Sequence, residues 1–123
     1  MKLEEVKLPG KHNLQNCMVA ACMAYRMGVS LDDIRAGISE FKGVEHRLEY
    51  VETIHDVRYY NDSKGTNTDA TITALKSFDQ SVILIAGGYD KNIPYAPLGE
   101  AAVTTVKTAI LLGATADKIE QAL

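Results

Sequence analysis

The sequence has few of the residues that crosslink small secreted domains or bind structural metals. Among 123 residues there are two cysteines, three histidines and no tryptophan. Cys17 and Cys22 lie in a segment expected to be helical, where their spacing puts them on different faces, so we predict buried, reduced thiols and no disulfide. No carboxylate or cysteine stands at ligand spacing from any histidine, so we predict no metal site.

An excess of positive charge is also missing. The 13 Lys and Arg residues stand against 16 Asp and Glu residues, so we do not expect a nucleic acid as partner. The longest apolar stretch, near residues 17–25, is too short to cross a bilayer and too far inside the chain for a signal peptide. We therefore expect no membrane insertion and a cytoplasmic location. Hydrophobic residues make up 46% of the chain, which is typical of a globular domain with a modest core.

The pattern of the first third of the chain predicts two packed helices. A short strand is expected before them, at residues 2–8. Nearly every residue from 14 to 27 is apolar or small, which indicates a helix buried on most sides. Ser30 with Asp33 three residues later matches a capping box, and an amphipathic helix follows that stops before Gly43.

The remaining two thirds alternates strands with helices. Two short strands flank a turn at His55-Asp56, and two apolar, β-branched runs follow later in the chain. Such an alternation, with β-branched runs that are apolar on both faces, indicates a parallel sheet covered by helices. We therefore predict an α/β fold, with a Rossmann-like, mostly parallel sheet preceded by two helices. The expected strands are 48–54, 57–60, 81–86 and 108–112, and the expected helices are 69–78, 98–105 and the segment from 115.

The pattern changes near residues 42–46, which predicts a boundary. Two helices cannot cover each other on several sides, so we expect residues 1–42 to be the C-terminal end of a larger domain. Residues 43–123 would form a second, truncated domain, because the chain stops directly after a βα unit. We interpret the sequence as an excerpt of a longer protein.

Polar residues gather in two loops where such a fold binds ligands, beyond the carboxyl ends of strands. The first, NDSKGTNTD at 61–69, precedes a helix that Asn67 or Thr68 would cap. The second, GGYDK, occupies residues 87–91. Composition alone leaves both loops open between a binding site and a solvated turn. Neither GxGxxG nor GxxxxGK[ST] occurs, so dinucleotide or P-loop binding is not supported.

Two further stretches carry polar groups. The first, GKHNLQN at residues 10–16, opens the first helix, and its simplest interpretation makes Asn13 the N-cap. The second is His46-Arg47 at the boundary, where an arginine is usually a surface residue.

Together and in order, the four stretches match one family. LPGKHNLQN, GVEHRLEYV, NDSKGTNTDAT and LIAGGYDK resemble the Mur ligases of peptidoglycan synthesis over nearly the whole chain, and NDSKGTN resembles the member that adds D-glutamate. The resemblance implies an acid–D-amino-acid ligase that uses ATP and Mg²⁺ to convert a carboxylate of a UDP-linked muramoyl peptide into an acyl phosphate, which the amino acid attacks.

The resemblance also implies a domain assignment. Residues 1–42 resemble the end of a central ATPase domain, and residues 43–123 resemble the C-terminal domain that brings the amino acid. In the family the P-loop and the groups that hold Mg²⁺ lie upstream, and the ATP site is shared by the two domains. We therefore expect the chain to need the rest of its ligase and to be inactive alone.

Individual roles follow from the same resemblance. The asparagines would face the adenine with the histidine beside them, the arginine would reach the ribose and phosphates, and the aspartate would accept from ribose hydroxyls. The implied ATP-binding residues are His12, Asn13, Asn16, Arg47 and Asp62. Lys64 would be catalytic, countering charge near the transferred phosphoryl group. Thr66 and Lys91 would hold D-glutamate, on loops that we expect to leave neighbouring strands and converge.

One position departs from the family pattern. Many relatives carry an acid directly after the glycine pair, where this sequence has Tyr89, with Asp90 one residue later. Two alternatives stay open: another Mur-type or folylpolyglutamate-type ligase, and a ligand-binding module without catalysis.

Overall fold

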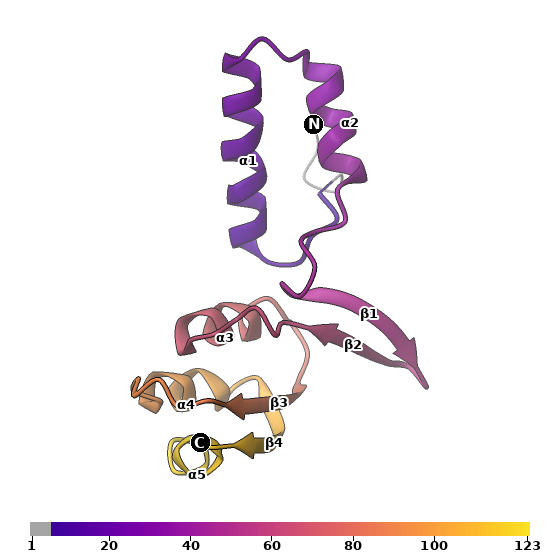
Figure 1. The fold of residues 1–123 in the computed structure, drawn as a ribbon. Helices are drawn as coiled ribbons and strands as arrows, with labels where there is room; N and C mark the ends of the chain where they lie inside the picture. Colours follow the sequence, from indigo (N-terminus) through magenta and orange to yellow (C-terminus); the bar gives the residue numbers. More distant parts are fainter. Residues whose placement is uncertain (1–5) are drawn as a thin grey trace. The chain divides into compact units, whose positions relative to one another are not determined.

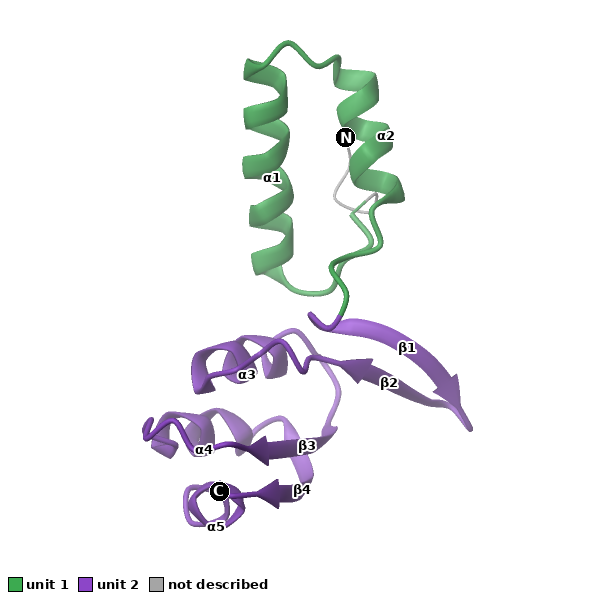
Figure 2. Ribbon diagram, viewed as in Figure 1, with its two compact units in different colours: residues 1–45 green, residues 46–123 purple. Residues whose placement is uncertain are grey.

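The computed structural model describes residues 6–123 and divides the chain into two compact units, Met1–Glu45 and His46–Leu123 (Figure 2). Among the described residues, the first unit is helical and the second contains the strands (Figure 1). Of the strand expected at 2–8, residues 6–8 are not in a strand and residues 2–5 lie outside the described part.

Helix α1, Lys11–Arg26, begins earlier than expected. Its N-cap is Gly10, whose φ of 89° suits a residue without a Cβ. The interpretation of Asn13 as the N-cap is therefore wrong, because this residue already lies in the first helical turn. Its amide Nδ2 instead donates to the Pro9 carbonyl oxygen at 2.8 Å, which ties the preceding segment to the helix.

The expected burial of α1 on most sides is wrong for the described chain. Only Asn13 and Cys17 are buried, whereas Met23 is 62% exposed. Cys22 is exposed as well, so the prediction of two buried thiols holds only for Cys17. The reason is geometric: one neighbouring helix covers one side of α1 and leaves its other apolar sides open.

Helix α2, Leu31–Glu40, confirms Ser30 as the N-cap of the predicted capping box. The Ser30 hydroxyl oxygen accepts from the Asp33 amide at 3.1 Å, and the hydroxyl donates to Asp33 Oδ2 at 2.6 Å. The helix ends at its C-cap Phe41, before Gly43 as expected.

The second unit opens with the antiparallel hairpin of β1, Glu49–Ile54, and β2, Val57–Asn61. Its two turn residues, His55 and Asp56, both have positive φ, 48° and 63°, as a tight two-residue hairpin turn requires. The Tyr60 ring packs edge-on against Phe78, with ring centroids 5.0 Å apart, and so joins the hairpin to the segment after the next helix.

The rest of this unit is an α/β arrangement, which confirms the predicted fold class. Strands β3, Val82–Gly88, and β4, Val106–Gly113, are parallel. The core contains one buried residue from each of three helices, which packs against residues of the two strands. The three buried residues are Leu75, Leu98 and Ile119. The helices are α3, Thr68–Leu75, α4, Ala96–Ala102, and α5, Ala116–Glu120.

Cover on both faces of this sheet, which the apolar strands predict, is not found in the described chain. The alternating residues Val82 and Ala86 pack on the helical core, but Ile83 is 50% and Ile85 63% exposed. Successive strand residues point to opposite faces, so the helices cover one face and leave the other open.

The glycine pair at the end of β3 has a steric explanation. Gly87 has a φ of 136°, and a Cβ there would lie 1.8 Å from the Leu112 carbonyl oxygen of β4. Gly88 has a similar φ of 134° but open space around it.

The contrast between Gly87 and Gly88 allows the effect of the close approach to β4 to be separated from the effect of backbone strain. Gly88→Ala should lower the free energy of unfolding by about 1–3 kcal/mol, because it introduces only backbone strain. Gly87→Ala adds a clash with β4 and should cost more than about 3 kcal/mol. Urea unfolding of both variants checks this, and equal losses would contradict the steric account.

Candidate functional site

Two hydrogen bonds, one of them to a side chain, hold the segment around Arg47 against the loop after β2. Asp62 Oδ1 accepts from the Leu48 amide at 2.8 Å, and the Lys64 amide donates to the His46 carbonyl oxygen at 2.9 Å. His46 and Leu48 have positive φ, 65° and 45°, a conformation that costs energy without such support. Arg47 is therefore presented from a fixed backbone while its side chain stays exposed.

The loop after β2 also satisfies many of its own polar groups. The Gly65 amide donates to the Asp62 carbonyl oxygen at 2.8 Å. Asn67 Oδ1 accepts from the Ala70 amide at 2.8 Å, so the prediction of Asn67 as a helix cap is confirmed. Lys64 and Thr66 are left exposed on a loop whose path is set by these bonds.

This loop meets the loop that follows β3. Lys91 Nζ donates to the Thr66 carbonyl oxygen at 3.3 Å. The expectation that both loops leave neighbouring strands of one sheet is wrong, because β2 pairs with β1 and β3 pairs with β4. The loops meet all the same, which brings Thr66 and Lys91 together. An ammonium group has three N–H donors, so two remain for an anionic ligand.

Asp90 is committed to contacts within the protein. Its Oδ2 accepts from the Lys118 ammonium on α5, and its Oδ1 accepts from the Asn92 amide at 2.8 Å. Both donors lower the pKa of the Asp90 carboxyl, and the carboxylate in turn raises the pKa of Lys118. Tyr89, by contrast, is 86% exposed.

Lys118 is a residue that the sequence patterns did not single out. It lies 28 positions from Asp90, and it looks like any basic residue in the last turn of a helix. Only the fold brings the two residues together.

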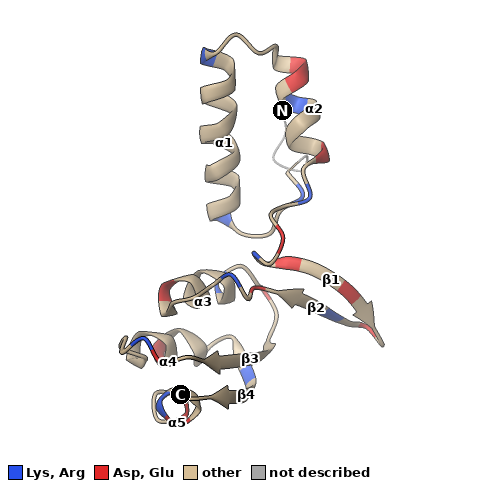
Figure 3. Ribbon diagram, viewed as in Figure 1, with Lys and Arg blue, Asp and Glu red and all other residues tan. Residues whose placement is uncertain are grey.

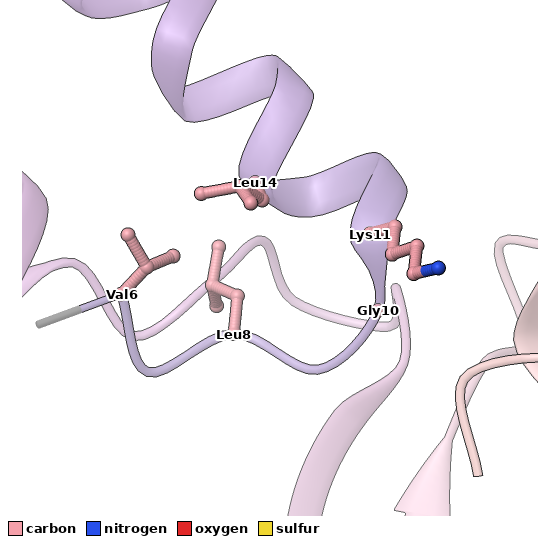
Figure 4. Close-up of a pocket in the computed structure, with 5 residues that line it drawn as sticks. All are labelled: Val6, Leu8, Gly10, Lys11 and Leu14. Carbon is pink, nitrogen blue, oxygen red and sulfur yellow. The ribbon is translucent and has the colours of Figure 1, made fainter. Parts of the chain in front are cut away.

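The candidate residues on α1 belong to the first unit. Asn13 is buried, His12 half-buried and Asn16 exposed, and the two asparagines are three positions apart, hence neighbours on the helix surface. A hollow of about 250 Å³ lies at the start of this helix, lined by Val6, Leu8, Gly10, Lys11 and Leu14. Three apolar side chains face one another there and the Lys11 side chain points away (Figure 4), so none of the three candidate residues lines this hollow.

Among the described residues, both units carry Lys or Arg as well as Asp or Glu (Figure 3). Within residues 6–123, no three His, Cys, Asp or Glu residues are grouped so that they could hold a metal ion. No helix in the same range is long and apolar enough to span a membrane.

Comparisons with known proteins agree on one group. Residues 46–123 match the family model described as Mur ligase, glutamate ligase domain. The chain is 50% identical over 117 residues to a UDP-N-acetylmuramoylalanine–D-glutamate ligase from Clostridioides difficile, covering 95% of this chain and 26% of that protein. A protein of the same name from Koribacter versatilis is 48% identical over 120 residues, which cover 98% of this chain and 26% of that protein. The chain thus spans about a quarter of the length of these relatives.

Solved structures show the same fold. A UDP-N-acetylmuramate-alanine ligase from Thermotoga maritima aligns with a TM-score of 0.74 at 17% identity, over 95% of this chain and 28% of that one. MurF from Acinetobacter baumannii aligns with a TM-score of 0.71 at 22% identity, over 92% and 27%.

The Asp90 contacts generate a prediction about acid titration. In the folded chain the carboxyl should titrate below the 3.8 of an unperturbed aspartate. A carboxyl whose pKa is lower in the folded than in the unfolded chain stabilises the fold at pH values above its unfolded-state pKa. This stabilisation is lost as the pH falls through the folded-state pKa. Lys118→Met should move the pKa of Asp90 back up, though incompletely, because the Asn92 amide still donates to it. Carbon-detected NMR titration measures this, and an unchanged pKa would show that the ion pair does not form in solution.

Proposed function

The chain belongs to the Mur ligase family, and on this premise we propose that it is part of an ATP-dependent ligase that adds D-glutamate to UDP-N-acetylmuramoyl-L-alanine in peptidoglycan synthesis. The observation that carries the proposal is the meeting of the Thr66 and Lys91 loops, which presents a cation beside a hydroxyl-bearing residue. The names of relatives that are 43–50% identical support the choice of D-glutamate.

Thr66 and Lys91 are the residues that we assign to D-glutamate. The Thr66 carbonyl oxygen takes one donor of the Lys91 ammonium and thereby fixes where the charge stands. The remaining donors suit a carboxylate of a small anionic amino acid, which the ammonium binds as a point charge. The Thr66 hydroxyl adds a neutral hydrogen bond, so the two residues contribute unequally.

The residues of the second unit that we assign to ATP are Arg47, Asp62 and Lys64. The donor set suits a nucleotide: two exposed cations for phosphate oxygens, and a carboxylate for ribose hydroxyls. Asp62 uses Oδ1 to accept from the Leu48 amide, so Oδ2 is the oxygen that we assign to the ribose.

The residues of the first unit that we assign to the adenine and its surroundings are His12, Asn13 and Asn16. Asn13 donates one amide hydrogen to Pro9, which leaves its Oδ1 and a second N–H for a base. Asn16 is exposed, so its whole amide is available to the same ligand.

In the proposed reaction a substrate carboxylate oxygen attacks the terminal phosphorus of ATP, ADP leaves, and the amine of D-glutamate then displaces phosphate from the acyl phosphate. ATP supplies the phosphoryl group, and Mg²⁺, which we assign to other parts of the ligase, offsets its charge. Within this chain, Lys64 would stabilise the charge on the transferring oxygens, and Lys91 with Thr66 would hold the amino acid in line.

The direct test is phosphate release by the ligase that carries this chain, with UDP-N-acetylmuramoyl-L-alanine, ATP and each of several amino acids. We expect release with D-glutamate and none with L-glutamate, L-lysine or L-alanine. Release with another amino acid would instead make the chain part of a different Mur-type ligase. An absence of release with all of them would favour a binding module.

The tied backbone around Arg47 predicts a specific loss. Arg47→Ala removes charge-assisted hydrogen bonds worth about 1.5–3 kcal/mol each, so kcat/KM for ATP should fall roughly tenfold to a hundredfold. Arg58→Ala on β2 is the matched control and should leave ATP kinetics unchanged, because this guanidinium contacts the Gln80 side-chain oxygen, at 3.4 Å, and is assigned no ligand. Equal kinetics for the parent and Arg47→Ala would make Arg47 a plain surface residue.

The unequal roles of Lys91 and Thr66 predict unequal kinetics. Lys91→Ala should raise the KM for D-glutamate strongly, with a smaller effect on ATP, because a carboxylate loses its partner. Thr66→Ala should weaken the binding of D-glutamate by about 0.5–1.5 kcal/mol, the contribution of one neutral hydrogen bond, because the main-chain carbonyl oxygen of residue 66 is retained. Amino-acid titrations at saturating ATP check both. If Lys91→Ala damaged ATP use but left the D-glutamate dependence alone, this lysine would belong to the phosphate site.

A further inference from the structure

We propose that Asp90 and Lys118 are positioning residues that keep the Lys91 ammonium free for the amino-acid substrate. The inference rests on the proposed function, because it takes Lys91 as the residue that binds D-glutamate. The family resemblance assigns no role to Lys118, and no step described above uses it.

Asp90 fixes the backbone on both sides of Lys91. Its Oδ1 accepts from the Asn92 amide at 2.8 Å, so this hydrogen bond joins the residues on either side of Lys91. Its Oδ2 accepts from Lys118, which attaches the same turn to α5. Asn92 has a φ of 54°, a conformation in the left-handed region that such a bond helps to hold. The chain direction at Lys91 is therefore set by Asp90.

Lys118 is itself carried by a fixed element. The next residue, Ile119, is 3% exposed and packs with Leu75 and Leu98 in the core of the second unit. Close contact between Gly99 of α4 and the Ala122 carbonyl oxygen holds the residues after α5 as well, since a Cβ on Gly99 would lie 1.7 Å from that oxygen. The ammonium of Lys118 thus reaches Asp90 from a rigid base.

The charge of Asp90 makes the pair necessary. An unpaired carboxylate next in the chain to Lys91 would compete with D-glutamate for the same ammonium and would repel the substrate carboxylates. Lys118 pairs with that carboxylate and offsets its charge, while Lys91 Nζ donates to the Thr66 carbonyl oxygen. Exposed ion pairs contribute little to folding, so the pair should affect substrate binding more than stability.

The test is steady-state kinetics of the ligase that carries this chain. Lys118→Met should raise the KM for D-glutamate about two- to fivefold, the size that an exposed ion pair supports, with KM for ATP and thermal stability unchanged. Lys118→Arg keeps the charge and should stay close to the parent. Lys107→Met, the same change at an exposed residue of β4, is the matched control and should have no effect.

A double variant separates positioning from general damage. If Lys118 acts through Lys91, then Lys118→Met should add nothing in a Lys91→Met background. The inference would be overturned if Lys118→Met raised the KM for D-glutamate by the same factor in the Lys91→Met background as in the parent. It would also be overturned if Lys118→Met raised the KM for ATP as much as that for D-glutamate. A parent-like KM for D-glutamate in Lys118→Met would overturn it as well.

Amide hydrogen exchange tests the positioning role of Lys118 separately from the proposed D-glutamate ligase function. Amides 88–92 should exchange faster in Lys118→Met than in Lys107→Met, whichever amino acid the ligase uses. If Lys91→Met left the D-glutamate KM unchanged, the assignment of Lys91 would fail and the inference with it, even with faster exchange. Unchanged exchange would overturn the inference by itself.

Discussion

The hydrogen bond from the Lys91 ammonium to the Thr66 carbonyl oxygen joins two loops that leave different two-stranded sheets. Without this contact, the loop after β2 and the loop after β3 would be separate surface turns. With it, the candidate amino-acid site has one position for a cation and one for a hydroxyl. Gly87 contributes to the same arrangement, because only a residue without a Cβ fits against the Leu112 carbonyl oxygen where β3 ends.

A second layer of contacts supports the loops from behind. Asp62 and Lys64 hold the backbone on either side of Arg47, and Asp90 with Lys118 holds the backbone on either side of Lys91. In both places a charged side chain with a proposed ligand role projects from a segment fixed by hydrogen bonds. Such fixing lowers the entropy lost when a ligand binds, which is how precise sites gain affinity.

Local chemistry was predictable from the sequence. The Ser30 cap, the Asn67 cap and the turn at His55-Asp56 depend on residues within four positions of one another, and the structure confirms each. The Asn13 cap was wrong because Gly10, with its free φ, begins the helix earlier and Asn13 finds Pro9 instead.

Features that depend on what covers a surface were not predictable. Apolar runs at α1 and β3 predicted burial on several sides, but Met23 and Ile85 remain exposed, because one helix covers α1 and helices cover only one face of β3 in the described chain. The contact between Asp90 and Lys118 was missed for a related reason. A pair separated by 28 positions has no local pattern, and only the packing of α5 on the core brings it together.

The most direct measurement of the central claim is a crystal structure of the ligase that carries this chain with D-glutamate bound. The account predicts a carboxylate of D-glutamate at about 2.7–3.0 Å from Lys91 Nζ, with that nitrogen still donating to the Thr66 carbonyl oxygen and the Thr66 hydroxyl facing the ligand. D-glutamate bound away from both residues, or Lys91 turned to a nucleotide phosphate, would contradict it.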